Sequence, residues 1–447
     1  MELIKVYDRM PVFIQNSLCS AYGYHLQKQR RSIEFYEYLT KALERKLWPY
    51  EKKCEFRDRQ LQVLVKYALS TPFYRKVFRE YGLNENSIRS LDDLSKLPII
   101  TKEIVKEHFD EFICENVPAK YRVKLHTSGS TGSGFVFYTT QSAFLRQWAN
   151  GMRGHISIGI SLDDWCGYFG GRPIVPSRVN KPPFYRYNYP GKQVLFSAYH
   201  MRPEYLSDYV EGIQKKQLKW LHGYPSSLSI LAEFILENNI KLGSIEHITT
   251  CSENLHLYQK KMIEQAFGTH PYQNYAQTEG VAVFMEHEQD VLTIDEDFAA
   301  VEFVKDEDGN SHVVGTNLWN YAMPFLRYDT RDLAECIETP TARVITQLDG
   351  REEDVVILAD GSKVGRLDHL FKDMKSVTAA QIIQKEIGKV EIHIVKGPEY
   401  RKEDEKKLQD DVHKRFGNRL NVKLVYKEVI SKGKNGKQRF VISEIKR

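Results

Sequence analysis

The stretch His126–Gly134 reads His-Thr-Ser-Gly-Ser-Thr-Gly-Ser-Gly, and it constrains the fold more than any other part of the chain. It lies between two strand-like runs, Tyr121–Leu125 and Phe135–Tyr138. Glycine permits φ > 0 and a close approach of the backbone to a ligand, and successive N–H groups in such a turn form an anion-binding concavity. The pattern therefore predicts a strand, a tight loop and a second strand. The loop fits a plain hairpin turn or a phosphate cradle. It is not a Walker A loop, because no Lys-Ser or Lys-Thr follows its last glycine.

Downstream segments carry the other side chains that a nucleotide site needs. Asn274–Gly280 offers an aromatic ring, a hydroxyl and a carboxylate within a few residues. Arg327–Asp332 and Gly350–Val356 are charged, and Gly433–Lys437 is a glycine loop that bears lysines. Each segment alone fits an ordinary turn or a solvated charged face. In this order and at these separations, the set predicts a nucleotide site.

Taken together, these segments resemble the adenylate-forming superfamily, which includes acyl-CoA synthetases, luciferases and peptide-synthetase adenylation domains. Within that superfamily, the chain is similar to the branch of phenylacetate–CoA ligases and CapK-like capsular-polysaccharide proteins. Further segments that carry the resemblance are Gln60–Thr71, Pro72–Arg75, Leu97–Lys102, Gly223–Ser227 and Lys437–Ser443. The resemblance extends from about Arg57 to the end of the chain.

The resemblance implies ATP-dependent chemistry in two steps. A carboxylate first attacks the α-phosphate of ATP, which gives an acyl-adenylate and pyrophosphate. A nucleophile then displaces AMP. Fixed hydrogen-bond donors, a cation and a metal ion are the usual means of stabilising the charge on the reacting phosphate. We therefore expect the chain to be an enzyme, an AMP-forming carboxylate ligase that uses ATP and Mg²⁺.

The glycine loop takes its role from the resemblance. Its expected phosphate-binding residues are Thr127, Ser128, Gly129, Ser130, Thr131 and Gly132. Ser128 to Gly132 would hold the β- and γ-phosphates. The family often closes this loop with a Pro-Lys pair, whereas this chain has Gly134-Phe135. The backbone and the hydroxyl groups then have to hold the phosphates without a lysine from the loop.

The segment around Tyr275 takes three further roles by the same resemblance. Tyr275 would stack on adenine, and Thr278 would bond the α-phosphate. Glu279 would hold Mg²⁺, which usually takes one or two carboxylates together with phosphate oxygens. Ser252 and Glu253 resemble the loop that borders adenine, and they also fit a plain turn at the end of a strand.

Asp332 would accept hydrogen bonds from the two ribose hydroxyls, as the family's Tyr-x-Thr-Gly-Asp-like motif implies. Arg331 stands where that motif has glycine. Arg351 would contact the ribose or a phosphate, and Glu353 occupies the hinge position where the family often has Asp. Lys437 matches the lysine of the mobile domain that reaches the α-phosphate and the substrate carboxylate, a partner that suits a compact ammonium charge. Lysine-rich glycine loops are also common as solvated turns.

The acid is expected to bind between segments that contain Tyr199, His200 and Tyr224, which are candidates for the wall of the acyl pocket. Ordinary packing accounts for each of these residues equally well. Neither the size nor the polarity of the acid follows from the sequence.

The acceptor of the acyl group is also open. The phenylacetate–CoA ligase branch implies CoA as the nucleophile, which is the interpretation we favour. The capsule-associated branch implies an amine and an amide product. A third alternative, of another class, is a nucleotide-binding scaffold without turnover, although both Lys437 and Glu279 are present.

The composition excludes some other functions. The 64 basic residues are nearly balanced by 59 acidic residues, and the net charge of +5 is small for 447 residues. No motif interleaves basic and aromatic residues, so we expect no nucleic-acid partner. No apolar run approaches the roughly 20 residues of a membrane span, and the N-terminus does not resemble a signal peptide. We expect a cytoplasmic protein whose six cysteines, none in a Cys-x-x-Cys motif, are reduced.

The pattern along the chain predicts an α/β fold with two domains. Residues 1–95 form a mostly helical lead-in, and residues 120–335 alternate β-rich runs with helical patterns, which is typical of a domain with parallel and mixed sheets. The character changes after Gly350. A strand at Val390–Lys396, a charged helix at Lys402–Phe416 and a strand at Asn421–Val429 predict a small α+β module. The resemblance implies that these are a large adenylation domain at 1–350 and a small mobile lid domain at 351–447.

Overall fold

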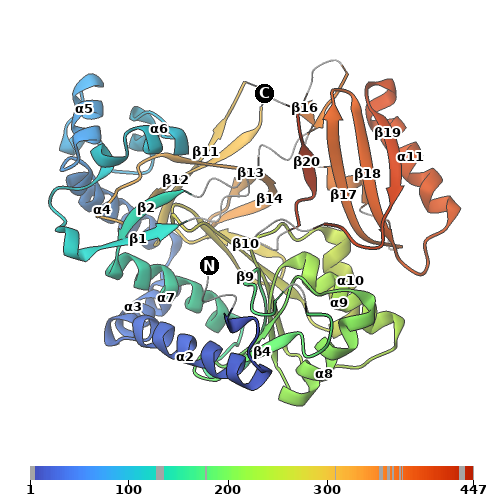
Figure 1. Cartoon of the computed structure of the whole chain (residues 1–447). Helices are drawn as coiled ribbons and strands as arrows, with labels where there is room; N and C mark the ends of the chain where they lie inside the picture. Colours follow the sequence, from blue (N-terminus) through green and yellow to red (C-terminus); the bar gives the residue numbers. More distant parts are fainter. Residues whose placement is uncertain are drawn as a thin grey trace. The chain divides into compact units, whose positions relative to one another are not determined.

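The computed structural model describes residues 6–445, with the exception of 127–134, 177–178, 308, 352–355, 360–362, 365–366, 372–373, 375 and 432–437. The chain divides into two compact units. Unit 1 combines residues 1–27, 163–273 and 349–447, and unit 2 combines residues 28–162 and 274–348. Each unit is therefore built from segments that lie far apart in the sequence, which the colours of Figure 1 make visible.

Unit 2 contains the helical lead-in and an antiparallel sheet. Its helices are α3 (Ile33–Lys46), α4 (Tyr50–Ala68), α5 (Pro72–Glu80), α6 (Lys102–Glu107) and α7 (Gln141–Ser157), and α2 (Val12–Arg30) leads into it. Its strands are β1 (Arg122–His126), β2 (Val136–Thr140), β9 (Val283–Glu288), β10 (Val291–Ile294), β11 (Ala299–Lys305), β12 (Ser311–Asn317), β13 (Tyr328–Glu338) and β14 (Arg343–Arg351), which ends just past the unit's last residue. The order of the larger sheet is β11-β12-β13-β14-β10-β9.

The core of unit 2 joins its two chain segments. Apolar residues of α4 and α5 pack with those of β9, β11 and β12 in one buried cluster. Helix α7 approaches β9 closely at Gly154, because a Cβ there would lie 2.3 Å from the sulfur of Met285. A larger side chain at position 154 would require the Met285 side chain to move.

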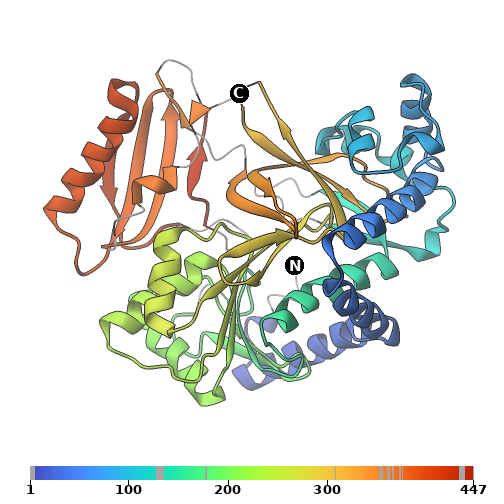
Figure 2. The same cartoon turned by 180° about the vertical axis from the view of Figure 1, so that it is seen from behind.

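Unit 1 contains a parallel sheet with helices on one face. Its strands are β3 (Cys166–Phe169), β4 (Tyr185–Asn188), β5 (Gln193–Phe196), β6 (Trp220–Gly223), β7 (His247–Thr250) and β8 (Pro271–Ala276), whose last residues pass into unit 2. Its helices are α8 (Leu206–Lys216), α9 (Pro225–Glu237) and α10 (Leu257–Phe267). The order is β8-β7-β6-β3-β5-β4, with only β4 antiparallel to its neighbour. The three helices share one apolar cluster with one face of these strands, and they lie side by side in both views (Figures 1 and 2).

The C-terminal part of unit 1 is an α+β module. Its elements are β15 (Val356–Ile357), β16 (Lys363–Val364), β17 (Val377–Glu386), β18 (Lys389–Lys396), α11 (Lys402–Phe416), β19 (Asn421–Tyr426) and β20 (Val441–Ser443). The main sheet has the order β19-β18-β17-β20, and α11 lies along it (Figure 1). Leu408, Val412 and Phe416 of α11 pack on the apolar residues of β17 and β18.

The predicted α/β fold class is confirmed, and most predicted elements are present. The strands on both sides of the glycine loop, the helices within Tyr205–Gln214 and Ser226–Glu237, and the hairpin closed at Asp306–Asn310 all occur. The last predicted strand is shorter than expected, because β19 ends at Tyr426 rather than Val429. The boundary near residue 350 between the two expected domains stays a prediction. Within the described residues, every helix is too short or too polar to cross a membrane.

Candidate active site

The structure describes the side chains of nine residues that are predicted for the site. Thr127 to Gly132, Glu353 and Lys437 lie outside the described residues. Arg351 is the last residue of β14, and its side chain also lies outside the described part. The nine others fall into two groups, one in each unit. Unit 2 holds Tyr275, Thr278, Glu279 and Asp332, whereas unit 1 holds Tyr199, His200, Tyr224, Ser252 and Glu253.

The loop that carries Thr278 and Glu279 is fixed by two amide side chains. Gln147 of α7 donates from Nε2 to the carbonyl oxygen of Gln277 at 2.8 Å. Asn317 at the end of β12 donates from Nδ2 to the carbonyl oxygen of Glu279 at 2.7 Å. Because its backbone carbonyls are held from two sides, the loop presents Thr278 and Glu279 in a defined orientation. Neither amide is predicted from the sequence, because its only signal there is a polar residue in an amphipathic helix or at a strand end.

Tyr275 and Asp332 are in direct contact, although 57 residues separate them in the sequence. The Tyr275 hydroxyl donates to Oδ2 of Asp332 at 2.8 Å. Burial, and then the negative charge of Asp332, raise the pKa of Tyr275, so the hydroxyl stays protonated as a donor. The Tyr275 ring stacks on Phe284, with ring centroids 4.6 Å apart. Both predicted nucleotide contacts are therefore held by neighbours within unit 2.

Negative charge gathers beside Glu279. Burial raises the pKa of the Tyr328 hydroxyl, and the charges of Glu279 and Glu103 raise it further. Both carboxylates thus act on one hydroxyl, while Arg331 forms an ion pair with Glu103. Glu279 is half-buried and Glu103 is exposed, and carboxylate oxygens suit a hard cation such as Mg²⁺. The metal role of Glu279 stays a prediction.

Arg331 adopts a backbone conformation that favours glycine. Its φ is 61°, in the left-handed region that non-glycine residues rarely occupy. The turn is stabilised because the Arg331 amide donates to Oδ1 of Asp329 at 2.8 Å, and the Asp332 amide donates to the Thr330 hydroxyl at 3.1 Å. The replacement of glycine by arginine therefore keeps the turn that positions Asp332.

In unit 1, Glu253 joins three parts of the chain. One carboxylate oxygen accepts the amide hydrogen of Ser226 at the start of α9, at 3.1 Å. The other oxygen accepts the amide hydrogen of Gln438 at 2.6 Å. A carboxylate is stabilised by the N-terminal end of a helix. Glu253 thus brings the residue that follows Lys437 next to the loop predicted to border adenine.

Two of the predicted acyl-pocket residues meet at one glycine. The Tyr199 hydroxyl donates to the carbonyl oxygen of Gly171 at 2.8 Å, and the Gly171 amide donates to the Tyr224 hydroxyl at 3.0 Å. His200 lies deeper, with Nδ1 2.7 Å from the Ser197 hydroxyl and with its ring stacked on a phenylalanine. Burial lowers the pKa of His200, so the neutral imidazole is favoured. Tyr199 and Tyr224 are thus joined through Gly171, whereas His200 is buried beside Ser197.

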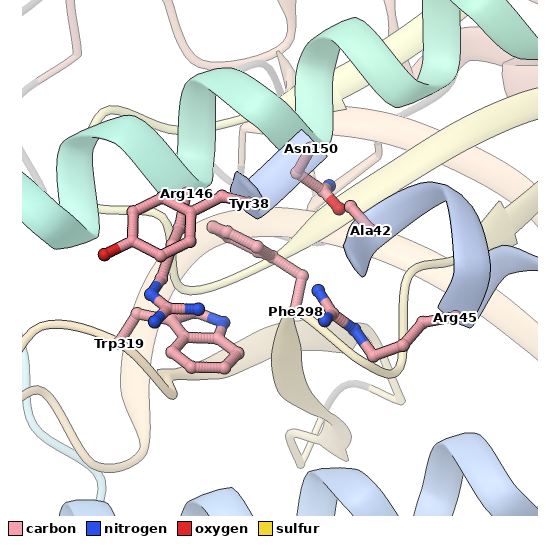
Figure 3. A pocket seen from close by; sticks show the side chains of 7 residues that line it. All are labelled: Tyr38, Ala42, Arg45, Arg146, Asn150, Phe298 and Trp319. Carbon is pink, nitrogen blue, oxygen red and sulfur yellow. The ribbon is translucent and has the colours of Figure 1, made fainter. Parts of the chain in front are cut away.

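A separate pocket lies in unit 2 (Figure 3). Its cavity volume is about 10 Å³, and it is lined by Tyr38, Ala42, Arg45, Arg146, Asn150, Phe298 and Trp319. The Arg146 guanidinium lies 3.9 Å from the ring centre of Tyr38 and 4.2 Å from that of Trp319. This lining contains none of the described residues predicted for the site.

Comparison with known sequences gives matches along the whole chain. Residues 356–444 match the family model described as the CapK C-terminal domain. Protein CapK of Staphylococcus aureus is 28% identical over 459 residues, which cover 99% of each chain. The phenylacetate-coenzyme A ligase of Escherichia coli (strain K12) is 26% identical over 344 residues, or 68% of this chain and 72% of that protein.

Comparison with solved structures identifies the fold. A 2-hydroxyisobutyryl-CoA ligase in the postadenylation state, in complex with R3-HIB-AMP, aligns with a TM-score of 0.69 and 19% identity. The alignment covers 89% of this chain and 90% of the ligase. An open conformation of that ligase with 2-HIB-AMP and CoA aligns with a TM-score of 0.56, also at 19% identity, over 88% of this chain and 92% of the ligase. The expected relationship and fold are confirmed by these matches.

Proposed function

From the premise that this chain is homologous to protein CapK and to phenylacetate-coenzyme A ligases, we propose that it activates a carboxylic acid with ATP as an acyl-adenylate, releasing pyrophosphate. The expectation that the chain is an enzyme is confirmed, because these homologues include ligases. The structural observation that carries the proposal is the Tyr275–Asp332 hydrogen bond beside the fixed loop of Thr278 and Glu279.

The residues of unit 2 take distinct roles in this proposal. Asp332 is a fixed acceptor for the ribose hydroxyls, and Tyr275, supported by Phe284, borders adenine. Thr278 is exposed on its loop and donates to the α-phosphate. Glu279 would hold Mg²⁺, which when bound supplies positive charge against the phosphates. A preorganised set of this kind stabilises charge without reorganising during the reaction.

The residues of unit 1 take the remaining roles. Tyr199 and Tyr224 would line the pocket for the acid. Ser252, Glu253 and Arg351 would contact the nucleotide. Lys437 would place its ammonium between the α-phosphate and the acid carboxylate, and the loop Thr127–Gly132 would hold the β- and γ-phosphates. These assignments come from the sequence resemblance.

The acceptor in the proposed second step is CoA. The open structure of 2-hydroxyisobutyryl-CoA ligase, which aligns over 88% of this chain, contains CoA. The alternative is an amine acceptor and an amide product, which is kept because protein CapK aligns with 99% of the chain. A cytoplasmic location is part of the same proposal, since both ATP and CoA are intracellular metabolites.

Carboxylate-dependent exchange of label between pyrophosphate and ATP tests the adenylation step. The panel would include aryl, fatty, amino and sugar acids, first without CoA and then with it. Exchange with one class of acid is expected, and CoA-dependent release of AMP would favour the CoA ligase over the amide ligase. An absence of exchange with every class, despite measurable ATP binding, would favour the scaffold alternative.

Two variants test the assigned residues in the same assay. Lys437→Ala is expected to abolish exchange, because the cation that neutralises the reacting groups is lost. Glu279→Ala is expected to raise the Mg²⁺ concentration needed for half-maximal exchange. Thermal unfolding should change little for Glu279→Ala, since the Glu279 side chain belongs to no apolar core cluster of the described residues. For Lys437→Ala, thermal unfolding shows whether the variant is folded. Wild-type exchange in both variants would show that the site is assigned wrongly.

A further inference from the structure

The parallel sheet of unit 1 has two chemically different faces. One face is apolar, because Phe169, Phe196, Leu221 and Ile248 pack against α8, α9 and α10. Residues on alternate positions point to the opposite face. In β6, β7 and β8 these are polar or aromatic, whereas Leu195 of β5 is a buried apolar residue on that face. Strand pairing places Tyr168, His222, Thr249 and Tyr272 in one row across β3, β6, β7 and β8. A sheet face with this composition is suited to a ligand rather than to a hydrophobic core.

Cys251 continues this polar face just beyond the end of β7. Its Sγ atom lies 3.5 Å from Nε2 of His222. Nδ1 of His222 lies 2.7 Å from the Thr249 hydroxyl oxygen, which also accepts the indole N–H of Trp220 at 2.8 Å. These contacts form a chain of thiol, imidazole and hydroxyl. A nucleophile, a base and a group that orients the base are the parts needed for covalent catalysis.

The hydrogen bonds allow the orientation in which His222 acts as a base toward Cys251. Trp220 is an obligate donor, so it occupies one lone pair of the Thr249 oxygen. The second lone pair can accept the Nδ1–H of His222, which leaves Nε2 as the acceptor that faces the Cys251 thiol. Burial lowers the pKa of His222, but the neighbouring Cys251 raises it, and the net effect is a raised value. A proton on this imidazole is therefore stabilised when a thiolate lies beside it.

The thiol also lies beside the residues predicted to bind the acid. The Cys251 amide donates to the carbonyl oxygen of Gly223 at 3.2 Å, and Gly223 directly precedes Tyr224. Burial raises the pKa of Tyr224, and the charges of Tyr168, Cys251 and Glu253 raise it further. Tyr224 and Tyr199 meet at Gly171. All of these residues belong to unit 1 and follow the carboxyl ends of parallel strands, where open α/β sheets bind ligands.

We propose that Cys251 is a nucleophilic thiol, with His222 as its base, and that it accepts the acyl group of the activated acid. In this step the Sγ proton moves to Nε2 of His222, and sulfur forms a bond to the acyl carbonyl carbon. The bond between that carbon and the phosphate oxygen breaks, and AMP leaves. The product is a thioester on the enzyme, which can pass the acyl group to CoA or to an amine. This inference rests on the proposed adenylation.

The thiol can be tested without adenylation by using p-nitrophenyl acetate, an activated acyl donor. We expect acetylation of Cys251, located by peptide mass, at least tenfold faster than acetylation of Cys336. Cys336 is a matched half-buried thiol whose pKa burial raises to about 11. His222→Gln, which keeps a donor toward Thr249, should slow the labelling of Cys251 about tenfold, whereas Cys336→Ala should not change it. Equal rates in His222→Gln and wild type would overturn the proposed base.

Acyl transfer from the natural intermediate is tested with the acid and ATP. After quenching, we expect the mass of the protein to rise by one acyl group, removable by hydroxylamine and absent in Cys251→Ala. Thermal unfolding of each variant shows whether it is folded. Pyrophosphate exchange without an acyl-enzyme would overturn this inference and leave the proposed adenylation intact. Absence of exchange would instead count against the adenylation, and the ester assay would then decide the nucleophilic role of Cys251 by itself.

Discussion

At the scale of single residues, two residues with left-handed backbone lie in the segments of unit 2 that are predicted to bind the nucleotide. Gly280 has a φ of 65° and Arg331 a φ of 61°. Glycine adopts this conformation without steric cost, whereas an L-residue with a side chain pays roughly 1–2 kcal/mol. The chain tolerates arginine at 331 because Asp329 and Thr330 accept the amide hydrogens of this turn.

The strain at position 331 can be measured with two substitutions. Arg331→Gly and Arg331→Ala both remove the ion pair with Glu103, so they differ mainly in backbone strain. We expect Arg331→Gly to be more stable than Arg331→Ala by about 1 kcal/mol in urea unfolding. Equal unfolding midpoints would contradict a left-handed conformation at this residue.

Gly280 is constrained by its neighbours as well as by its φ. A Cβ at this position would lie 2.8 Å from Nδ2 of Asn317 and 3.2 Å from Oε1 of Gln147, the two amides that hold the loop. We expect Gly280→Ala to slow pyrophosphate exchange at least tenfold, because the loop with Thr278 and Glu279 would shift. Gly268→Ala is the matched control, since Gly268 has a φ of 69° and open space around it. A similar loss of exchange in both variants would count against a role for the Gly280 contacts.

At the scale of elements, helix α9 and strand β17 meet at a buried carboxyl group. The Thr378 hydroxyl donates to Oε1 of Glu233. Burial raises the pKa of Glu233 to about 7, with a further rise from Glu237. The neutral carboxyl is therefore the form that the folded protein favours at this contact.

This raised pKa predicts how stability depends on pH. The folded protein binds this proton more tightly than the unfolded chain, so the contribution is complete below pH 4.5 and is lost as the pH rises through about 7. The loss is up to about 3 kcal/mol. We expect the unfolding midpoint of Glu233→Gln to depend little on pH between pH 5 and pH 8. Glu237→Gln should keep most of the pH dependence of the wild type. An unchanged slope in Glu233→Gln would refute the raised pKa.

At the scale of the whole molecule, each unit depends on contacts between distant parts of the chain. In unit 2, Arg153 of α7 pairs with Asp297 at 2.8 Å and with Asp295 at 2.9 Å, and Arg45 of α3 also pairs with Asp297. Both carboxylates and the Arg153 guanidinium are almost fully buried. This network ties residues 28–162 to residues 274–348.

Removing the central arginine should therefore destabilise both segments of unit 2. Arg153→Met leaves two carboxylates buried without their main partner, which costs about 3–5 kcal/mol. Hydrogen exchange should accelerate in residues 28–162 and 274–348 together. Arg75→Met removes an exposed pair with Glu115 and should cost at most about 1 kcal/mol. Faster exchange in only one of the two segments would show that they do not unfold as one unit.

The sequence by itself determined the local elements, the α/β class and the relationship to acyl-activating ligases. Strands at Arg122–His126 and Val136–Thr140, and helices such as Pro225–Glu237, follow from periodicity and from turn residues. These signals are local, because alternation at two residues or at three and four residues depends only on neighbouring positions. The resemblance also assigned roles to Tyr275, Glu279 and Asp332 before any contact was known.

Only the tertiary structure decided which of these residues meet. The Tyr275–Asp332 bond spans 57 residues, and the Cys251–His222 contact depends on the register of β6 with β7. The division into units of two and three chain segments likewise has no local signal. Strand order and register are fixed by the packing of whole sheet faces, and a slip of one residue would turn every side chain to the other face. Contacts between distant residues therefore follow from the assembled sheet and not from any single segment.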